Sequence, residues 1–161
     1  MTRDENYQKA AAALGYSFDG EIKSGGNYAP LVRDGNVIYV SGQVPRVGSE
    51  LVVSGRAGAE VSLAQAQLGA KICVLRALAL LQRSLGSLDH IRSVNRVTVF
   101  VQSSPDFTQQ SEVADGGSDL LVSILGSVGA HTRTSVGVYQ LPKNATVELD
   151  FIFGVDQVGK T

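Results

Sequence analysis

Cysteine and histidine are scarce in this chain of 161 residues, which has one cysteine, two histidines and no tryptophan. A single cysteine excludes an intramolecular disulfide and a zinc site built from cysteine pairs. Cys73 lies beside an apolar helical stripe, so we expect a small packed side chain rather than a reactive thiol. His90 and His131 lack the spacing of a catalytic triad or a metal-ligand cluster, and we expect no metal and no cofactor.

Charge is sparse as well: 14 Lys and Arg against 15 Asp and Glu give a net charge of −1. Nucleic-acid binding needs clustered basic residues, and the scattered Arg83, Arg92 and Arg96 form no such cluster, so no nucleic-acid partner is expected. No apolar run approaches the roughly 20 residues of a membrane span, and the N-terminus lacks the apolar stretch of a signal peptide. We therefore expect a cytoplasmic protein without a membrane partner.

Apolar residues and glycine are plentiful, at 43% of the chain and 18 residues respectively. The length suits one domain over residues 1–161 with a sizeable core. A weakly charged, apolar domain of this size has apolar surface left to cover, and self-association is one way to cover it.

Hydrophobic periodicity predicts two main helices among several strands. Asp34-Gly35-Asn36 between β-branched runs indicates a hairpin, and Ser62 is expected to begin a long helix that Gly86 ends. A second helix is expected to break at Asp115-Gly116-Gly117, with Ser118 capping its second piece. The predicted segments are a short helix at 6–15, strands at 31–33, 37–40, 94–101, 133–139 and 146–153, and helices at 62–84 and from 105 onward. This order predicts an α+β fold, an antiparallel or mixed sheet with two helices packed on one face.

Arg133 is the residue with the clearest chemical potential, because it begins a strand whose other residues, Thr134 to Val138, carry no charge. A planar guanidinium in such a place is suited to bidentate binding of a carboxylate. An arginine at a strand end that simply faces solvent fits the same pattern. Spacing alone leaves both interpretations open.

Three stretches together resemble the Rid family, also called the YjgF or reactive-intermediate deaminase family. They are NYAPLVRDGNVIYVSGQVP at 27–45, VTVFV with Asp-Phe at 97–107, and HTRTSVGV, Leu-Pro and VELD within 131–150. They occur in the family's order and cover most of the chain between residues 27 and 155. The residues before Ser24 form an N-terminal extension, 1–23, that is longer than usual in this family.

The resemblance implies a chorismate-mutase-like mixed β-sheet with two helices on one face, assembled as a homotrimer with sites in clefts between subunits. It implies hydrolysis of reactive enamine or imine intermediates to a 2-oxo acid and ammonia, without a cofactor. In this sequence, Arg133 takes the place of the family's carboxylate-binding arginine, and Asp150 is expected to position the water. Tyr28 and Ser111 are expected to contact the substrate, a small carboxylate or imine.

Several positions differ from the family pattern. Asp150 stands where the family usually has glutamate, Ser111 where it has asparagine, and Ala29-Pro30 removes two polar groups beside Tyr28. Two alternatives to the deaminase therefore stay open. One is a trimeric protein that binds a small carboxylate without turnover. The other is a ribonuclease, an activity ascribed to some relatives, against which the low basic content argues.

Overall fold

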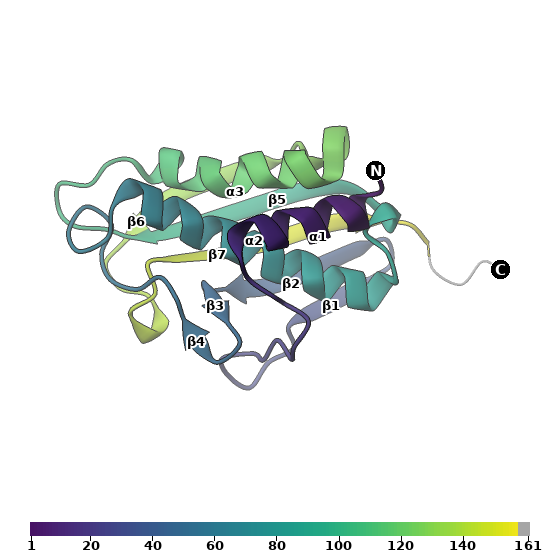
Figure 1. Ribbon diagram of the computed structural model, residues 1–161, viewed down its shortest axis with the longest axis horizontal. Helices are drawn as coiled ribbons and strands as arrows, with labels where there is room; N and C mark the ends of the chain where they lie inside the picture. Colours follow the sequence, from purple (N-terminus) through teal and green to yellow (C-terminus); the bar gives the residue numbers. More distant parts are fainter. Residues whose placement is uncertain (158–161) are drawn as a thin grey trace.

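The computed structural model describes residues 1–157, and the last four residues of the expected domain lie outside the described part. Its main sheet has five strands in the order β1-β2-β7-β5-β6, and a separate two-stranded hairpin joins β3 and β4 (Figure 1). β5 and β6 run parallel and the other neighbours are antiparallel, so the sheet is mixed. The strands are β1 Leu31–Asp34, β2 Val37–Gln43, β3 Arg46–Val47, β4 Glu50–Leu51, β5 Ile91–Gln102, β6 Thr132–Val138 and β7 Val147–Val155.

The helices lie on one side of this sheet, as the sequence predicts (Figure 1). α2 begins with a capping box between Ser62 and Gln65 and ends at Gly86, whose φ of 85° is left-handed. The helices are α1 Arg3–Leu14, α2 Leu63–Leu85 and α3 Gln110–Leu125, with short 3₁₀ turns η1 Leu88–His90, η2 Gly126–Gly129 and η3 Pro142–Asn144. The architecture is the expected α+β layer, and α1 confirms the short helix predicted at 6–15, although it begins three residues earlier.

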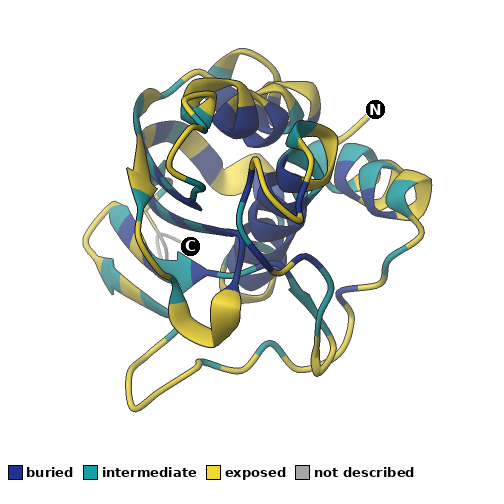
Figure 2. Cartoon of the chain, turned by 90° about the vertical axis from the view of Figure 1, so that its left-hand side faces the viewer, coloured by how far each residue is buried: buried dark blue, intermediate teal, exposed yellow. Residues whose placement is uncertain are grey.

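The core fills the space between α2, α3 and one face of the sheet (Figure 2). Alternation along β7 sends Leu149, Phe151 and Phe153 into this core. The intervening Glu148, Asp150 and Ile152 face the other way, and so does Tyr39 on β2, which pairs with Ile152. No helix of the described residues covers that second face. It combines carboxylates with partly exposed apolar side chains.

The prediction of a broken second helix is wrong, because α3 runs without interruption from Gln110 to Leu125. Gly116 and Gly117 are buried against α2, where a Cβ on Gly116 would come within 2.9 Å of the Gln67 carbonyl oxygen. The glycines therefore allow close packing of two helices rather than a break. Ser118 caps nothing, and its hydroxyl instead contacts His131 and Arg133.

The N-terminal extension packs onto the domain rather than trailing from it. Asp4 in α1 accepts hydrogen bonds from Gln82, Ser87 and the backbone of Leu88. Arg83 of α2 donates to the carbonyl oxygens of Phe18 and Gly20. Among the described residues only α2 is long and apolar enough to cross a membrane, and 67% of its most apolar window is buried, as expected of a core helix.

Candidate functional site

Arg133 lies on β6, one of the two edge strands of the main sheet, on the sheet face that α3 covers. Its Nη1 donates to Asp115 Oδ1 at 2.8 Å and to Ser118 Oγ at 3.0 Å. Its Nη2 donates to Ser111 Oγ at 2.8 Å and to the Ser111 carbonyl at 3.4 Å. The Arg133 side chain is 20% exposed, and that of its ion-pair partner Asp115 is 54% exposed. The guanidinium is thus held in one orientation at the surface by three side chains of α3.

His131 extends this cluster through Ser118. One ring nitrogen of His131, Nε2, lies 2.8 Å from Ser118 Oγ, and the other, Nδ1, lies 2.6 Å from the Gly129 carbonyl oxygen. A carbonyl only accepts, so Nδ1 carries the proton and a neutral ring accepts from Ser118 through Nε2. Ser118 can then accept from Arg133 while donating to His131. The relay fixes the position of the hydroxyl that Arg133 contacts.

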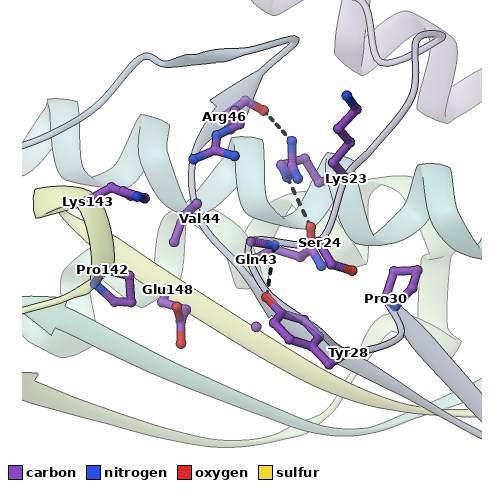
Figure 3. A pocket seen from close by; sticks show the side chains of 13 residues that line it. Lys23, Ser24, Tyr28, Pro30, Gln43, Val44, Arg46, Pro142, Lys143 and Glu148 are labelled. Carbon is purple, nitrogen blue, oxygen red and sulfur yellow. Dashed lines mark hydrogen bonds between the residues drawn. The ribbon is translucent and has the colours of Figure 1, made fainter.

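A cavity of about 190 Å³ opens elsewhere, between the end of β2, the start of β7, α2 and the segment before β1 (Figure 3). Tyr28 and Glu148 point into it from two different segments of the chain. The Tyr28 side chain is 52% exposed, and its hydroxyl accepts a hydrogen bond of 3.2 Å from the Gly25 amide. The remaining lining comes from Lys23, Ser24, Gly25, Pro30, Gly42, Gln43, Val44, Arg46, Arg76, Pro142 and Lys143.

Glu148 reaches this cavity because Gly42 leaves room for it. A Cβ on Gly42 would lie 2.8 Å from Glu148 Oε2, so any larger residue would displace the carboxylate. Burial and, secondarily, the charge of Asp150 raise the pKa of the Glu148 carboxyl above its usual value. A half-buried carboxyl with a raised pKa that lines a cavity is suited to proton transfer.

Asp150 is two residues further along the same face and does not line the cavity. It pairs with Thr98 of β5 across the open face, and burial raises its carboxyl pKa although a Thr98 hydrogen bond and the Arg96 charge oppose this. The acid that shares the cavity with Tyr28 is therefore Glu148. The water-positioning role that the sequence analysis gives to Asp150 stays a prediction.

Arg76 also lines the cavity, from the middle of α2. It is 5% exposed, its Nε donates to Gln43 Oε1 at 3.0 Å, and its Nη1 donates to the Arg46 carbonyl at 2.8 Å. Burial, aided by the nearby Arg46 charge, lowers its pKa. No carboxylate forms an ion pair with Arg76 anywhere in residues 1–157.

Residues 9–154 match a family model described as "YjgF/chorismate mutase-like, putative endoribonuclease". The match covers nearly all of the fold and contains both the Arg133 cluster and the cavity. This chain belongs to the YjgF/Rid family.

Relatives of this YjgF/Rid chain support the assignment. Protein TCP17 from Trypanosoma cruzi is 43% identical over 125 residues, which are 77% of this chain and 78% of that protein. The crystal structure of protein Atu1372 from Agrobacterium tumefaciens has a TM-score of 0.85 and 36% identity, over 96% of this chain and 94% of that one. RidA from a Psychrobacter species, at 22% identity and a TM-score of 0.58 over 87% of this chain and 98% of that one, shares the fold.

The structure of this YjgF/Rid protein brings together some predicted residues and separates others. Ser111 contacts Arg133 directly, whereas Tyr28 lies in the cavity with Glu148. Sequence reasoning missed Glu148, which stood in the quoted VELD string, and Arg76, whose signal was a lone charge within the apolar run ICVLRALALL. Cys73 is fully buried as expected, and burial raises its thiol pKa. The described residues include no group of three or more His, Cys, Asp or Glu that could hold a metal ion.

Proposed function

We propose that this protein hydrolyses a small imine bearing a carboxylate to a 2-oxo acid and ammonia. Arg133 binds the carboxylate, Glu148 activates a water molecule, and Tyr28 forms part of the cleft wall. The observation that carries the proposal is the orientation of the Arg133 guanidinium by Ser111, Ser118 and Asp115 at the protein surface. Asp115, Ser118 and Ser111 already accept from both Nη atoms, so a substrate carboxylate binds by displacing Asp115 from a guanidinium that is already oriented.

The reaction needs little from the protein because a protonated imine is already electrophilic. Water attacks the imine carbon and loses a proton to Glu148, and a carbinolamine forms. That proton passes to the nitrogen, and the carbon–nitrogen bond breaks with its electron pair leaving on nitrogen as ammonia. Glu148 takes the hydroxyl proton as the carbonyl of the 2-oxo acid forms and passes it to the ammonia, which leaves as ammonium. Orientation of water and substrate and one proton acceptor suffice for these steps.

The site requires a second copy of the chain. Arg133 is on β6 and faces α3, whereas Glu148 is on β7, two strands away, and faces the open side. Neighbouring strands are about 4.8 Å apart, so the two groups are separated by roughly 10 Å and by the sheet itself. A small imine cannot contact both in one subunit. We place the site between the edge of one subunit and the cavity of another, within a homotrimer whose subunits cover the open faces with one another.

The test is turnover of imines generated in the assay by an amino-acid oxidase, followed as 2-oxo acid release. The wild-type protein should accelerate release over buffer, and Arg133→Ala should abolish the acceleration. Glu148→Gln and Asp150→Asn form a matched pair on one strand. The first should lower kcat at least tenfold and the second should leave it within about twofold, because only Glu148 lines the cavity. Loss of turnover in Asp150→Asn alone would show that Asp150, and not Glu148, activates the water molecule.

Mixing inactive variants tests the shared site. Trimers assembled from equal amounts of Arg133→Ala and Glu148→Gln chains should regain about a quarter of wild-type activity. Each shared site takes Arg133 from one chain and Glu148 from another, and about a quarter of the sites then contain both intact residues. Sites contained in one chain would regain none. If 2-oxo acids bind only when Arg133 is present and imines are not turned over, the protein binds small carboxylates without catalysis. The Arg133–Asp115 ion pair is the observation that favours this second function. Cleavage of single-stranded RNA in the same preparation would instead support the endoribonuclease description of the family.

A further inference from the structure

The cavity carries an excess of positive charge that imine hydrolysis does not use. Lys23, Arg46, Arg76 and Lys143 line it, and Glu148 is its one acidic residue (Figure 3). Charges of one sign around a concave site attract a ligand of the opposite sign. The lining is therefore unlike that expected for an apolar substrate tail.

Arg76 is the most informative of these cations because it is buried. An ion removed from water without an opposite charge costs several kcal/mol, and buried arginines are almost always paired. Here the partners of Arg76 are two neutral oxygens, the Gln43 amide and the Arg46 carbonyl, which orient the guanidinium without neutralising it. No hydrogen bond leaves its Nη2 within the described part of the chain. A site of this kind retains capacity for an anion.

A neighbouring arginine has a buried donor without a partner. Arg46 Nε is buried and has no hydrogen-bond partner among the described residues, and the Arg46 side chain lines the same cavity. Buried donors without partners are rare in folded proteins and indicate a missing ligand or water. Arg76 of α2 and Arg46 of β3 thus both have N–H donors without acceptors at the same cavity.

The cavity is large enough for a small organic acid. A cavity of about 150 Å³ accommodates benzene, which has six heavy atoms, and this one is about 190 Å³. It also opens to solvent past Tyr28 and Lys143, which are exposed. A four- or five-carbon substrate can place one end here and keep its reacting carbon near Glu148.

We propose that the substrate of this protein carries a second carboxylate, which binds in the cavity to Arg76 and Arg46. The inference rests on the proposed function, in which Arg133 of another subunit holds the first carboxylate. It makes the preferred substrates imines of acidic amino acids, with dicarboxylic 2-oxo acids as products. Arg76 is then a specificity-determining residue that contacts the substrate at a distance from the reacting carbon.

Calorimetry with two product analogues tests the proposal. The acids 2-oxoglutarate and 2-oxopentanoate have the same carbon chain and differ in a terminal carboxylate against a methyl group. Wild-type protein should bind 2-oxoglutarate at least tenfold more tightly, since a buried charge-assisted hydrogen bond contributes about 1.5–3 kcal/mol. Arg76→Gln should remove this preference and leave the affinity for 2-oxopentanoate within about twofold. Equal weakening of both acids by Arg76→Gln would show a purely structural role and overturn the proposal.

A second set of variants covers a failure of Arg76→Gln to fold. Arg46→Gln and Lys143→Gln remove charges nearer the cavity mouth and should each reduce the preference for 2-oxoglutarate. Lys9→Gln, on the exposed side of α1, removes the same charge away from the cavity and should not change it. The proposal would be contradicted if the preference for 2-oxoglutarate persists in both Arg46→Gln and Lys143→Gln. It would also be contradicted if Lys9→Gln reduces this preference as much as the cavity variants do.

The two proposals fail in different ways. If Arg133→Ala leaves turnover intact while the 2-oxoglutarate preference still depends on Arg76, the proposed function is wrong and the anion site stands. If turnover depends on Arg133 but the two acids bind equally, the second carboxylate is wrong and the hydrolysis stands.

Discussion

Two arginines of this protein have opposite electrostatic environments. Arg133 sits at the sheet edge beside an exposed carboxylate, Asp115, at 2.8 Å. Arg76 is buried in α2 and held by neutral oxygens alone. The first guanidinium has its charge balanced within the chain, and the second does not. Any anion that binds Arg133 must compete with Asp115, whereas one that binds Arg76 supplies the missing charge.

The difference between the two arginines distinguishes the orientation of a guanidinium from the attraction of an anion to it. Surface ion pairs contribute little to stability, so the Asp115 contact mainly orients Arg133. A buried unpaired arginine lowers the stability of the folded chain, and proteins keep such residues where function requires them. In the proposed reaction, Arg133 recognises the carboxylate common to all 2-oxo acids, and Arg76 discriminates among those acids.

The largest effect is expected from giving Arg76 an internal partner. Gln43→Glu places a carboxylate where the amide oxygen now lies, 3.0 Å from Arg76 Nε. Arg76 then resembles Arg133, with its charge satisfied within the chain, and affinity for 2-oxoglutarate should fall about tenfold or more. Binding of 2-oxopentanoate should change little. Isothermal titration calorimetry of both acids measures the effect.

The control for this substitution is Gln8→Glu, the same change at an exposed position of α1. It adds one negative charge to the protein but none to the cavity, so both affinities should stay at wild-type values. An equal loss of 2-oxoglutarate binding in Gln8→Glu and Gln43→Glu would mean that overall charge, and not the cavity, determines the preference.

The opposite change at the other arginine should have a smaller effect. Asp115→Asn keeps the shape of the side chain and removes its charge, leaving Arg133 oriented by Ser111 and Ser118. Affinity for 2-oxopentanoate should rise roughly two- to fivefold, because an exposed ion pair is worth about 0.2–1 kcal/mol. Asp119→Asn, on the same helix, is the matched control. Weaker binding in Asp115→Asn would show that Asp115 supports the ligand instead of competing with it.

The sequence names two site residues in the Arg133 cluster and one in the cavity, Tyr28, and the roles it gives them stay predictions. Arg133 and Ser111 contact each other, and both were named from motifs. The sequence names Asp150 and not Glu148, and residues two apart on a strand share a face, so a pattern cannot say which of them meets the opposing loop. Gly42, from a different strand, leaves the space through which Glu148 reaches the cavity.

Helix α3 illustrates a second limit of sequence reasoning. Two adjacent glycines lower helix propensity, and that local effect predicted a break. Packing outweighs it, because Gly116 and Gly117 let α2 and α3 approach more closely than any side chain permits. The sequence does not identify Arg76 for a related reason. The apolar periodicity of α2 assigns the whole helix to the core, and a single charge does not change that periodicity.

The smallest expected effect concerns the two acids of β7 and the pH dependence of stability. Burial raises the carboxyl pKa of both Glu148 and Asp150 in the folded state. A carboxyl with a raised pKa favours folding below its unfolded pKa, about 4, and this contribution is lost as pH rises through the folded value. Glu148→Gln and Asp150→Asn should therefore gain stability relative to wild type between about pH 4 and pH 7.

Urea unfolding at several pH values measures this gain, which should stay below about 1 kcal/mol because solvent screens both half-exposed groups. The same gain in both variants, combined with loss of turnover in Glu148→Gln alone, would separate burial from catalysis. Burial affects both acids of the strand, and only the cavity distinguishes them. If neither variant gains stability with rising pH, the two carboxyls are not destabilised by burial, and the raised pKa can no longer explain how Glu148 accepts a proton from water.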